Sequence, residues 1–251
     1  TNAIWKERMP NHTYNEYQIR KDEPVNARYY YRTNGLVNLD KSNMPSYQPE
    51  AYQKPGCPII VDLNGDGQIT VEDVDMKNVI PSLYWGLGNT FTYKNWDLDV
   101  FIYSQLGVDK YNDVYSWTSG RGLGNQTNNM SVYIKDVWHS ELNPNGTIPG
   151  IAYEMASVSL PGGAGTDIGY ENSSFVRVRN ITLGYNFKPN QLGTLSKLLS
   201  GIRVYVDVQN PFTFTGYTGL DPEVNTGGNY KGGKAEYPQT RTFSLGTKLS
   251  F

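Results

Sequence analysis

The sequence predicts an all-β chain, built from long antiparallel strands of a large transmembrane β-barrel with long extracellular loops. Aromatic residues make up 13% of the 251 residues, with 20 Tyr, beside 26 Gly and 14 Pro, a composition that suits strands, turns and loops better than helices. Several stretches alternate apolar and polar residues over about the 9–11 residues that cross a bilayer at a tilt. The connections between these stretches alternate between very short and very long, as in outer-membrane barrels.

The bulk properties of the chain exclude other classes. No stretch holds about 18 consecutive apolar residues, so the sequence contains no candidate membrane-spanning helix. A formal net charge of −2 and a pI near 5.7 give no electrostatic reason to expect nucleic acid as a partner. The single cysteine, Cys57, cannot form an internal disulfide. The first residues lack the basic region and apolar core of a signal peptide, so we expect a removed signal or a longer chain upstream.

The N-terminal third gives two strand predictions and one unusual loop. Residues 13–21 and 27–37 are predicted strands, the second ending at the turn pair Asn34-Gly35. Residues 38–60 are polar and contain prolines, and they lead directly into "VDLNGDGQITVEDVD" at 61–75.

The next two strands are predicted with a clear pair of faces. Residues 83–93 and 96–107 flank the turn Lys94-Asn95. Asp97 and Asp99 point to the polar face of the second strand. Its apolar face is formed by Trp96, Leu98, Val100 and Ile102.

Three further strands are predicted at 174–187, 201–211 and 241–251. In the first, Val176 and Val178 are out of phase with Ile181 and the apolar residues after it, which predicts a β-bulge near Arg179-Asn180. Residues 108–173 are predicted to be a long loop, with a short helix in "MSVYIKDVWHSEL".

The order of strands and connections favours a barrel over a soluble β-sandwich, which would alternate in the same way. With the C-terminus placed on the periplasmic side, the short connections 94–95 and 188–200 fall inside. The long connections 38–82, 108–173 and 212–240 then fall outside. In a compact soluble domain, loops of that length would count against the strand assignment.

Six blocks together carry a family resemblance. They are "EPVNARYYYRTNGL", "DLNGDGQIT", "YWGLGNTFTYKNWDLDVFIYSQLG", "SSFVRVRNITLGYNF", "RVYVDVQNPFTFTGYTGLDPE" and "YPQTRTFSLGTKLSF". From about residue 14 to Phe251 the chain resembles the C-terminal part of SusC/RagA-type TonB-dependent outer-membrane transporters. The resemblance implies a plugged barrel of roughly 22 strands in the outer membrane of a Gram-negative bacterium. It also implies uptake of oligosaccharides or peptides, driven by the TonB system through the plug, with a SusD-like surface lipoprotein as the lid.

The chain departs from that family in what it lacks. It contains no plug, no TonB-box region and no N-terminal strands, and about seven predicted strands are too few to close such a barrel. Because an open segment leaves unpaired edges that lipid does not tolerate, residues 1–251 are expected to be the C-terminal part of a larger barrel. The partners expected are the rest of the barrel, the plug and outer-membrane lipids. The ending "LGTKLSF" is similar to the C-terminal signal for barrel insertion.

The loop at 62–73 has the oxygen spacing of a calcium-binding loop. Ca²⁺ takes six to eight oxygens at flexible distances, which side chains spaced by two can supply. Gln68 would offer its backbone carbonyl, and position twelve is an Asp where the template has Glu. The predicted ligands are Asp62, Asn64, Asp66, Gln68 and Asp73.

The flanks of this loop favour a structural role for the metal. "KPGCPIIV" before it contains two prolines and cannot form an entering helix, so a calcium-triggered helix pair is not available. A structural calcium clip is favoured over a metal-free Asn/Asp/Gly turn, and both are favoured over a regulatory switch.

No catalytic residue is predicted. His12 and His139, the two histidines, are far apart in sequence, and no acid/base pair is identifiable by spacing; the chain is therefore not expected to be an enzyme. Substrate-binding residues are not predicted, because loop packing is favoured over sugar stacking for Tyr115, Trp117 and Tyr217. An interfacial aromatic belt is predicted from Tyr84, Trp85, Tyr93, Trp96, Tyr185 and Phe187.

One alternative from another class remains open at this point. A secreted, soluble β-sandwich that binds carbohydrate and carries a structural calcium would share the alternation and the loop. A calcium-stabilised hydrolase is disfavoured by the missing acid/base pair.

Overall fold

The computed structural model describes residues 28–112, 115, 130–150, 160–161, 165–224 and 237–251. The chain divides into two compact units. We call Pro81–Gly107, Asn172–Asn225 and Glu236–Phe251 the long-strand unit, and Thr1–Ile80, Val108–Glu171 and Thr226–Ala235 the short-strand unit.

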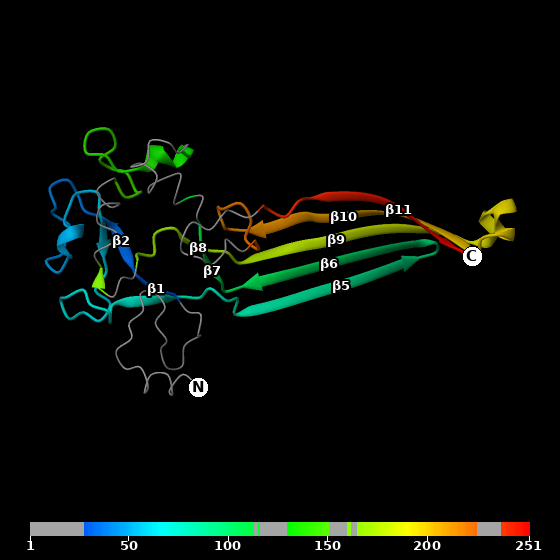
Figure 1. Ribbon diagram of the computed structural model, residues 1–251, viewed down its shortest axis with the longest axis horizontal. Coiled ribbons are helices and arrows are strands. Elements are labelled where there is room, and N and C mark those ends of the chain that lie inside the picture. Colours follow the sequence, from blue (N-terminus) through cyan, green and yellow to red (C-terminus); the bar gives the residue numbers. More distant parts are fainter. Residues whose placement is uncertain (1–27, 113–114, 116–129, 151–159, 162–164, 225–236) are drawn as a thin grey trace, which may run out of the picture. The chain divides into compact units, whose positions relative to one another are not determined.

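The long-strand unit is one antiparallel sheet of five strands in the order β11-β10-β9-β6-β5 (Figure 1). Each strand therefore pairs with the long strand before and after it in the sequence, the simplest order for alternating short and long connections. The strands are β5 (Leu83–Tyr93), β6 (Trp96–Leu106), β9 (Phe175–Phe187), β10 (Gly201–Thr215) and β11 (Thr242–Ser250). All five predicted long strands are confirmed.

One face of this sheet is apolar and open to its surroundings. The register places Leu87, Ile102 and Val178 in one row and Phe91, Leu98 and Leu183 in another. Phe243 is 71% exposed and Leu245 is 76% exposed. A continuous apolar face of this kind marks a surface made for contact with lipid or another protein.

The predicted bulge in β9 is confirmed. Pairing with β6 passes from Phe101–Asn180 directly to Ile102–Val178, so Arg179 has no opposite residue on β6. The extra residue returns Val178 to the apolar face, which explains the phase change in the sequence. The pairing of β9 with β10 shifts at the same level, between Gln209 and Phe212.

The opposite face is polar and cross-linked near the short turns. Gly184 on β9 pairs with Asp97 on β6 and with Tyr205 on β10, and Arg203 lies two residues before Tyr205 on the same face of β10. The Arg203 guanidinium spans the central strand to form a salt bridge with Asp97, and Asn186 donates a further bond of 2.5 Å to the same carboxylate. A Cβ at Gly184 would lie 2.6 Å from Asp97 Oδ2 and 2.7 Å from Arg203 Nε. The glycine is therefore the residue that leaves room for the ion pair.

The short connections meet at one end of the sheet, as the sequence predicts. Asn95, in the β5–β6 turn, donates a 2.8 Å bond to Gln191 in the β9–β10 connection. The Ser200 N–H donates to the Ser250 carbonyl at 2.8 Å, which brings the end of β11 to the same place. The β9–β10 connection contains two 3₁₀ helices, η5 (Pro189–Gln191) and η6 (Gly193–Lys197).

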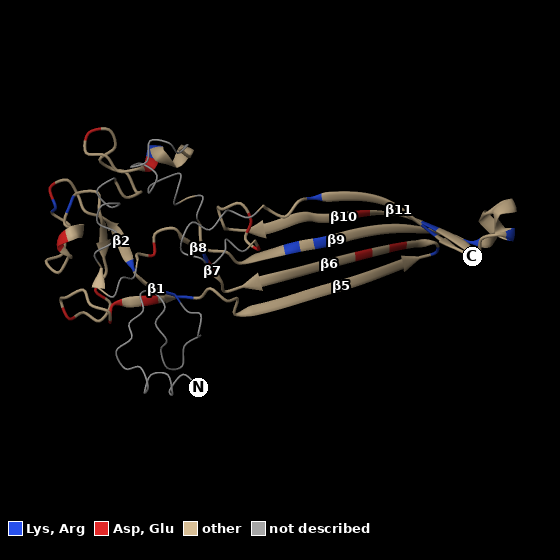
Figure 2. Ribbon diagram, in the orientation of Figure 1, with Lys and Arg blue, Asp and Glu red and all other residues tan. Residues whose placement is uncertain are grey.

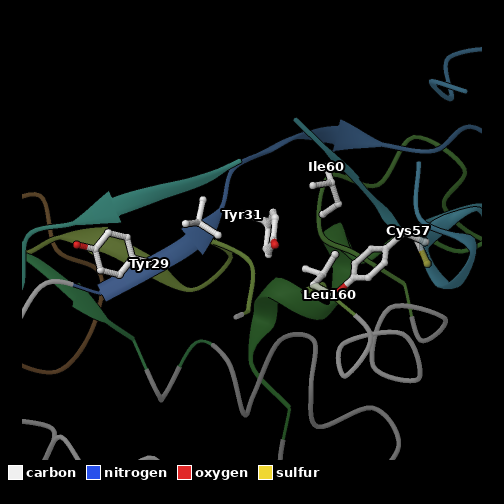
Figure 3. Close-up of a cluster of buried hydrophobic side chains, with 7 residues drawn as sticks. Tyr29, Tyr31, Cys57, Ile60 and Leu160 are labelled. Carbon is white, nitrogen blue, oxygen red and sulfur yellow. The ribbon is translucent and has the colours of Figure 1, made fainter. Parts of the chain in front are cut away.

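The short-strand unit is built from two-stranded pairs and 3₁₀ turns. β1 (Arg28–Tyr31) pairs with β4 (Val74–Lys77), β2 (Thr33–Leu36) with β3 (Pro58–Ile60), and β7 (Asp109–Tyr111) with β8 (Tyr170–Asn172). Two 3₁₀ helices are η1 (Glu50–Tyr52) and η3 (Val132–Asp136). Its core (Figure 3) consists of Tyr29, Tyr31, Tyr52, Cys57, Ile60, Val74 and Leu160.

Several predictions for this unit are wrong in detail. Asn34-Gly35 lies inside β2 at a register shift rather than in a turn, with Gly35 at φ 73°. Residues 27–37 thus form two short strands, which pair outside the five-stranded sheet. The helix expected in 130–142 is the five-residue 3₁₀ helix η3. The strand predicted at 13–21 lies outside the described residues.

No helix within the described ranges is both long enough and apolar enough to cross a membrane.

Gly184→Ala is expected to destabilise the sheet, because its methyl group displaces the Asp97–Arg203 pair. Hydrogen bonds to charged groups contribute about 2 kcal/mol each, so we expect a loss of that size in the free energy of unfolding. The measurement is the urea midpoint of the full-length protein in detergent.

Gly201→Ala is the matched control, since a Cβ there meets only the Phe187 carbonyl, at 3.7 Å. Equal midpoints for the two variants would contradict the role assigned to Gly184.

Candidate functional site

The loop between β3 and β4 folds as a series of turns closed by its own acidic and amide side chains. The Asp62 carboxylate accepts from the N–H groups of Gly65 at 2.7 Å and Gly67 at 2.8 Å. Asn64 accepts from the Asp66 N–H at 3.0 Å, and Asp66 accepts from the Gln68 N–H at 2.8 Å. These bonds are the local turn chemistry that Asn and Asp favour. The first three predicted metal ligands therefore lie together on one exposed loop.

Asp73 holds the two ends of that loop together from inside. It is fully buried, and its Oδ1 accepts from the N–H groups of Leu63 at 3.0 Å and Asn64 at 3.3 Å. Its Oδ2 accepts from the Thr70 N–H at 2.7 Å and the Thr70 hydroxyl at 3.3 Å. Burial acts to raise the pKa of this carboxyl, but the four donors outweigh burial and hold the pKa below its usual range. The bonds are therefore present at neutral pH and are lost only when acid protonates the carboxylate.

Sequence reasoning missed this closing role of Asp73. Thr70-Val-Glu-Asp73 has the Ser/Thr-x-x-acid spacing of a capping box, in which the acid accepts from the first residue's N–H. The sequence contains this signal, but the calcium-loop spacing led us to assign Asp73 as a metal ligand instead. Among the described residues, no group of three or more His, Cys, Asp or Glu side chains is placed to hold a metal ion. The calcium site stays a prediction.

Tyr31 connects the loop to the core of the short-strand unit. Its buried ring lies in the core, and its hydroxyl is 2.9 Å from both the Thr70 carbonyl and the Pro161 carbonyl. Burial raises the pKa of this hydroxyl strongly, and the negative charge of Asp73 raises it further. Tyr31 thus remains a neutral donor that fixes the end of the loop.

A buried arginine organises the far end of the polar face of the long-strand sheet. The Arg177 side chain, on β9, is only 1% exposed. Its Nη2 donates to both oxygens of Asp221 at 2.9 Å, and its Nη1 donates to Glu223 at 2.6 Å. Its Nε donates to the Thr213 hydroxyl at 2.9 Å. Every nitrogen of the guanidinium is therefore bound, which a buried charge requires.

Asp221 is bonded from three directions and belongs to the connection after β10. Besides Arg177, it accepts from the N–H groups of Glu223 at 2.8 Å and Gln239 at 3.1 Å. Burial acts to raise the pKa of Asp221, and these donors together with the positive charge of Arg177 lower it on balance. The connection is thus fastened to β9 by ionised groups. No sequence pattern pointed to this cluster, because its members are far apart along the chain.

The aromatic residues of the predicted belt lie at both ends of the long strands. Trp96 meets Tyr185 edge-on at 4.8 Å, and Tyr185 meets Phe187 at 4.7 Å, beside the short turns. Trp85 lies on the apolar face at the other end of β5, whereas Tyr84 pairs with Gln105 on the polar face.

The remaining candidate residues have structural roles or lie outside the described ranges. His139 Nδ1 accepts from the N–H groups of Glu141 and Leu142 and so closes a turn. Tyr217 is buried, 7% exposed, and Tyr115 packs edge-on against Tyr133. His12 and Trp117 lie outside the described residues.

Comparison with proteins of known sequence finds TonB-dependent receptors. The chain is 34% identical to the TonB-dependent receptor SusC of Bacteroides thetaiotaomicron over 208 residues, 80% of this chain and 19% of the relative. It is 28% identical to the TonB-dependent receptor P3 of Formosa agariphila over 93% of this chain and 23% of the relative. The chain thus spans about a fifth of the length of these curated relatives. No protein-family model matches it.

Solved structures agree on the fold. The RagAB peptide importer in its closed-closed state matches 89% of this chain and 23% of its own, with a TM-score of 0.62 and 22% identity. Its open-open state matches with a TM-score of 0.60. At this identity the match concerns the fold alone, and it confirms the predicted antiparallel barrel section. The relatives are receptors rather than enzymes, in agreement with the sequence.

By sequence over most of its length and by the fold of its long strands, the chain resembles the SusC/RagA-type TonB-dependent outer-membrane receptors, and the resemblance carried by the six sequence blocks is confirmed.

Proposed function

We propose that this chain is the C-terminal part of the barrel of a TonB-dependent importer in the outer membrane of a Gram-negative bacterium. One observation carries the proposal. The five-stranded sheet exposes apolar side chains such as Phe243 and Leu245 on one face and keeps ion pairs such as Asp97–Arg203 on the other. A wall between lipid and an aqueous lumen has these two faces, whereas a soluble β-sandwich buries its apolar face against a second sheet.

The cargo we propose is a nutrient too large for porins, an oligosaccharide or a peptide. The family resemblance of the sequence implies either cargo, and the fold shared with the RagAB peptide importer is compatible with the second. We also propose two partners. A SusD-like lipoprotein covers the outer loops as a lid, and the TonB system drives uptake through a plug.

The proposal is tested on the full-length protein. We expect it to fractionate with the outer membrane, to require detergent, and to support growth on its cargo only when TonB is present. A chain that stays monodisperse in plain buffer and binds sugar alone would instead identify the soluble carbohydrate-binding alternative.

Within this transporter we propose that Arg177 fastens the connection after β10 onto the lumen side of the wall. The guanidinium is bidentate to Asp221, and Glu223 joins it from two residues further along. Arg179 approaches the same Glu223 at 3.4 Å, but its side chain is 42% exposed. Because exposed pairs contribute little and buried pairs are costly to break, Arg177 is the residue that holds the connection.

Arg177→Met is expected to release residues 216–224, because it leaves two carboxylates without their buried cation. Removing one partner of a buried pair costs about 3–5 kcal/mol. The measurement is amide hydrogen exchange of that segment in the detergent-solubilised protein.

Arg179→Met is the control, and it is expected to cost less than about 1 kcal/mol. Equal exchange rates in the two variants would show that burial of Arg177 does not hold the segment.

We also infer that the loop at 62–73 binds Ca²⁺ as a structural ion. Asp62, Asn64 and Asp66 are spaced by two, Asn64 and Asp66 are exposed and Asp62 is half-buried, and the Gln68 carbonyl follows them. Oxygen donors of these types are those Ca²⁺ prefers. Both carboxylate oxygens of Asp73 already accept hydrogen bonds from four donors of the loop. If Asp73 also bound the calcium ion, its oxygens would have to give up some of these bonds.

Removing calcium is expected to increase proteolysis within residues 60–80 while the long strands stay protected. The measurement is limited proteolysis of the full-length protein with and without a chelator, read by mass spectrometry. Asp62→Asn with Asp66→Asn should reproduce the chelator's effect. Absence of calcium from purified protein by elemental analysis would rule the site out.

A further inference from the structure

The short-turn end of the long-strand sheet is rich in unneutralised positive charge. Lys94 lies in the β5–β6 turn, and Lys188 and Lys197 lie in the β9–β10 connection; all three are exposed. None of them forms an ion pair in the described part of the chain. Figure 2 shows basic residues at this end of the sheet, near the C-terminus.

The acidic residue that follows the β5–β6 turn is already satisfied. Asp97, the first polar-face residue after the turn, is bound by Arg203 and by Asn186. It lies on the polar face of the sheet, opposite Gly184 on β9. The three lysines are therefore free to bind an external anion.

Exposed apolar side chains accompany the lysines. Leu195, within η6, is 54% exposed and Leu198, one residue past Lys197, is 69% exposed. Leu199, by contrast, is buried, at 8% exposed. A short segment with exposed leucines beside a lysine has the composition of a chain that lies in a membrane interface.

A row of aromatic residues indicates how deep the lysines and leucines lie in a bilayer. Tyr93, Trp96 and Tyr185 occupy one register level across β5, β6 and β9, the last before the turns. Aromatic rings of this kind lie at the headgroup level of a bilayer. Lys94 Nζ lies over the Tyr93 ring at 5.3 Å, one step closer to the aqueous side. The lysines therefore lie where lipid phosphates lie.

We propose that Lys94, Lys188 and Lys197, with Leu195 and Leu198, form a binding surface for anionic phospholipid headgroups at the short-turn end of the barrel. The ammonium groups pair with lipid phosphates, and the two leucines enter the boundary of the acyl chains. This inference rests on the proposed placement of the sheet in a membrane. A lipid is favoured over a soluble anion because the leucines and the aromatic row are contiguous with the charge.

The test is lipid binding by the full-length protein in detergent, titrated with phosphatidylglycerol and, in parallel, with phosphatidylcholine. Each lysine near an anionic surface contributes about a fivefold gain in affinity. Lys94→Gln, Lys188→Gln and Lys197→Gln together are therefore expected to weaken phosphatidylglycerol binding by about a hundredfold and to leave phosphatidylcholine binding unchanged. Native mass spectrometry of retained lipid reads the difference.

Two variants serve as controls. Lys→Arg at the three positions keeps the charge and should keep binding. Lys41→Gln, Lys54→Gln and Lys135→Gln change three exposed lysines of the short-strand unit and should also keep it. Unchanged phosphatidylglycerol binding in the first triple variant, or an equal loss in the control triple variant, would overturn the proposal.

The outcome is separable from that of the proposed function. A full-length protein that does not enter the outer membrane contradicts the importer. A protein that does enter it but holds phosphatidylglycerol without the three lysines contradicts only the lipid surface.

Discussion

In the membrane placement proposed here, the long-strand unit depends on one constraint, that each backbone N–H and carbonyl within lipid needs a partner strand. β6, β9 and β10 each have two neighbours in the sheet, whereas β5 and β11 have one each in the described part of the chain. Each of these outer strands leaves a row of backbone groups unpaired along an edge. Further strands on both sides are therefore needed before this sheet can form a wall in a bilayer.

Burial of charge governs the polar face. A charge there must be paired, because an isolated one is costly to remove from water. Arg203 reaches Asp97 across a whole strand, and only a glycine at position 184 lets the two groups meet. Arg177 is satisfied in another way, by drawing two carboxylates from the following connection onto β9. Pairing of the charges on the polar face therefore requires a glycine at position 184 and holds the connection after β10 against β9.

The sequence predicted the features that depend on local alternation. The five long strands, their faces and the bulge at Arg179 follow from period-two patterning, which each strand carries by itself. The pairings of the short-strand unit were not predicted, since they join distant residues such as Tyr29 and Met76. Asn34-Gly35 illustrates the limit, because the same dipeptide suits a hairpin turn and the bulge found in β2. Of the site, the aspartate-rich loop was predicted, whereas the Arg177 cluster joins positions 44 residues or more apart and had no sequence signal.

The role of Asp73 changes what calcium would contribute to the loop. In a small metal-dependent domain the ion supplies the folding free energy, and the apo form is unfolded. Here four donors on one buried carboxylate, together with the Tyr31 hydroxyl at the Thr70 carbonyl, already close the loop. An ion bound by Asp62, Asn64 and Asp66 would therefore meet a largely preformed turn, and its binding energy would stiffen the exposed tip. Calcium bound in this loop would thus act on local opening, and the pairing of β3 and β4 with their neighbours would not depend on it.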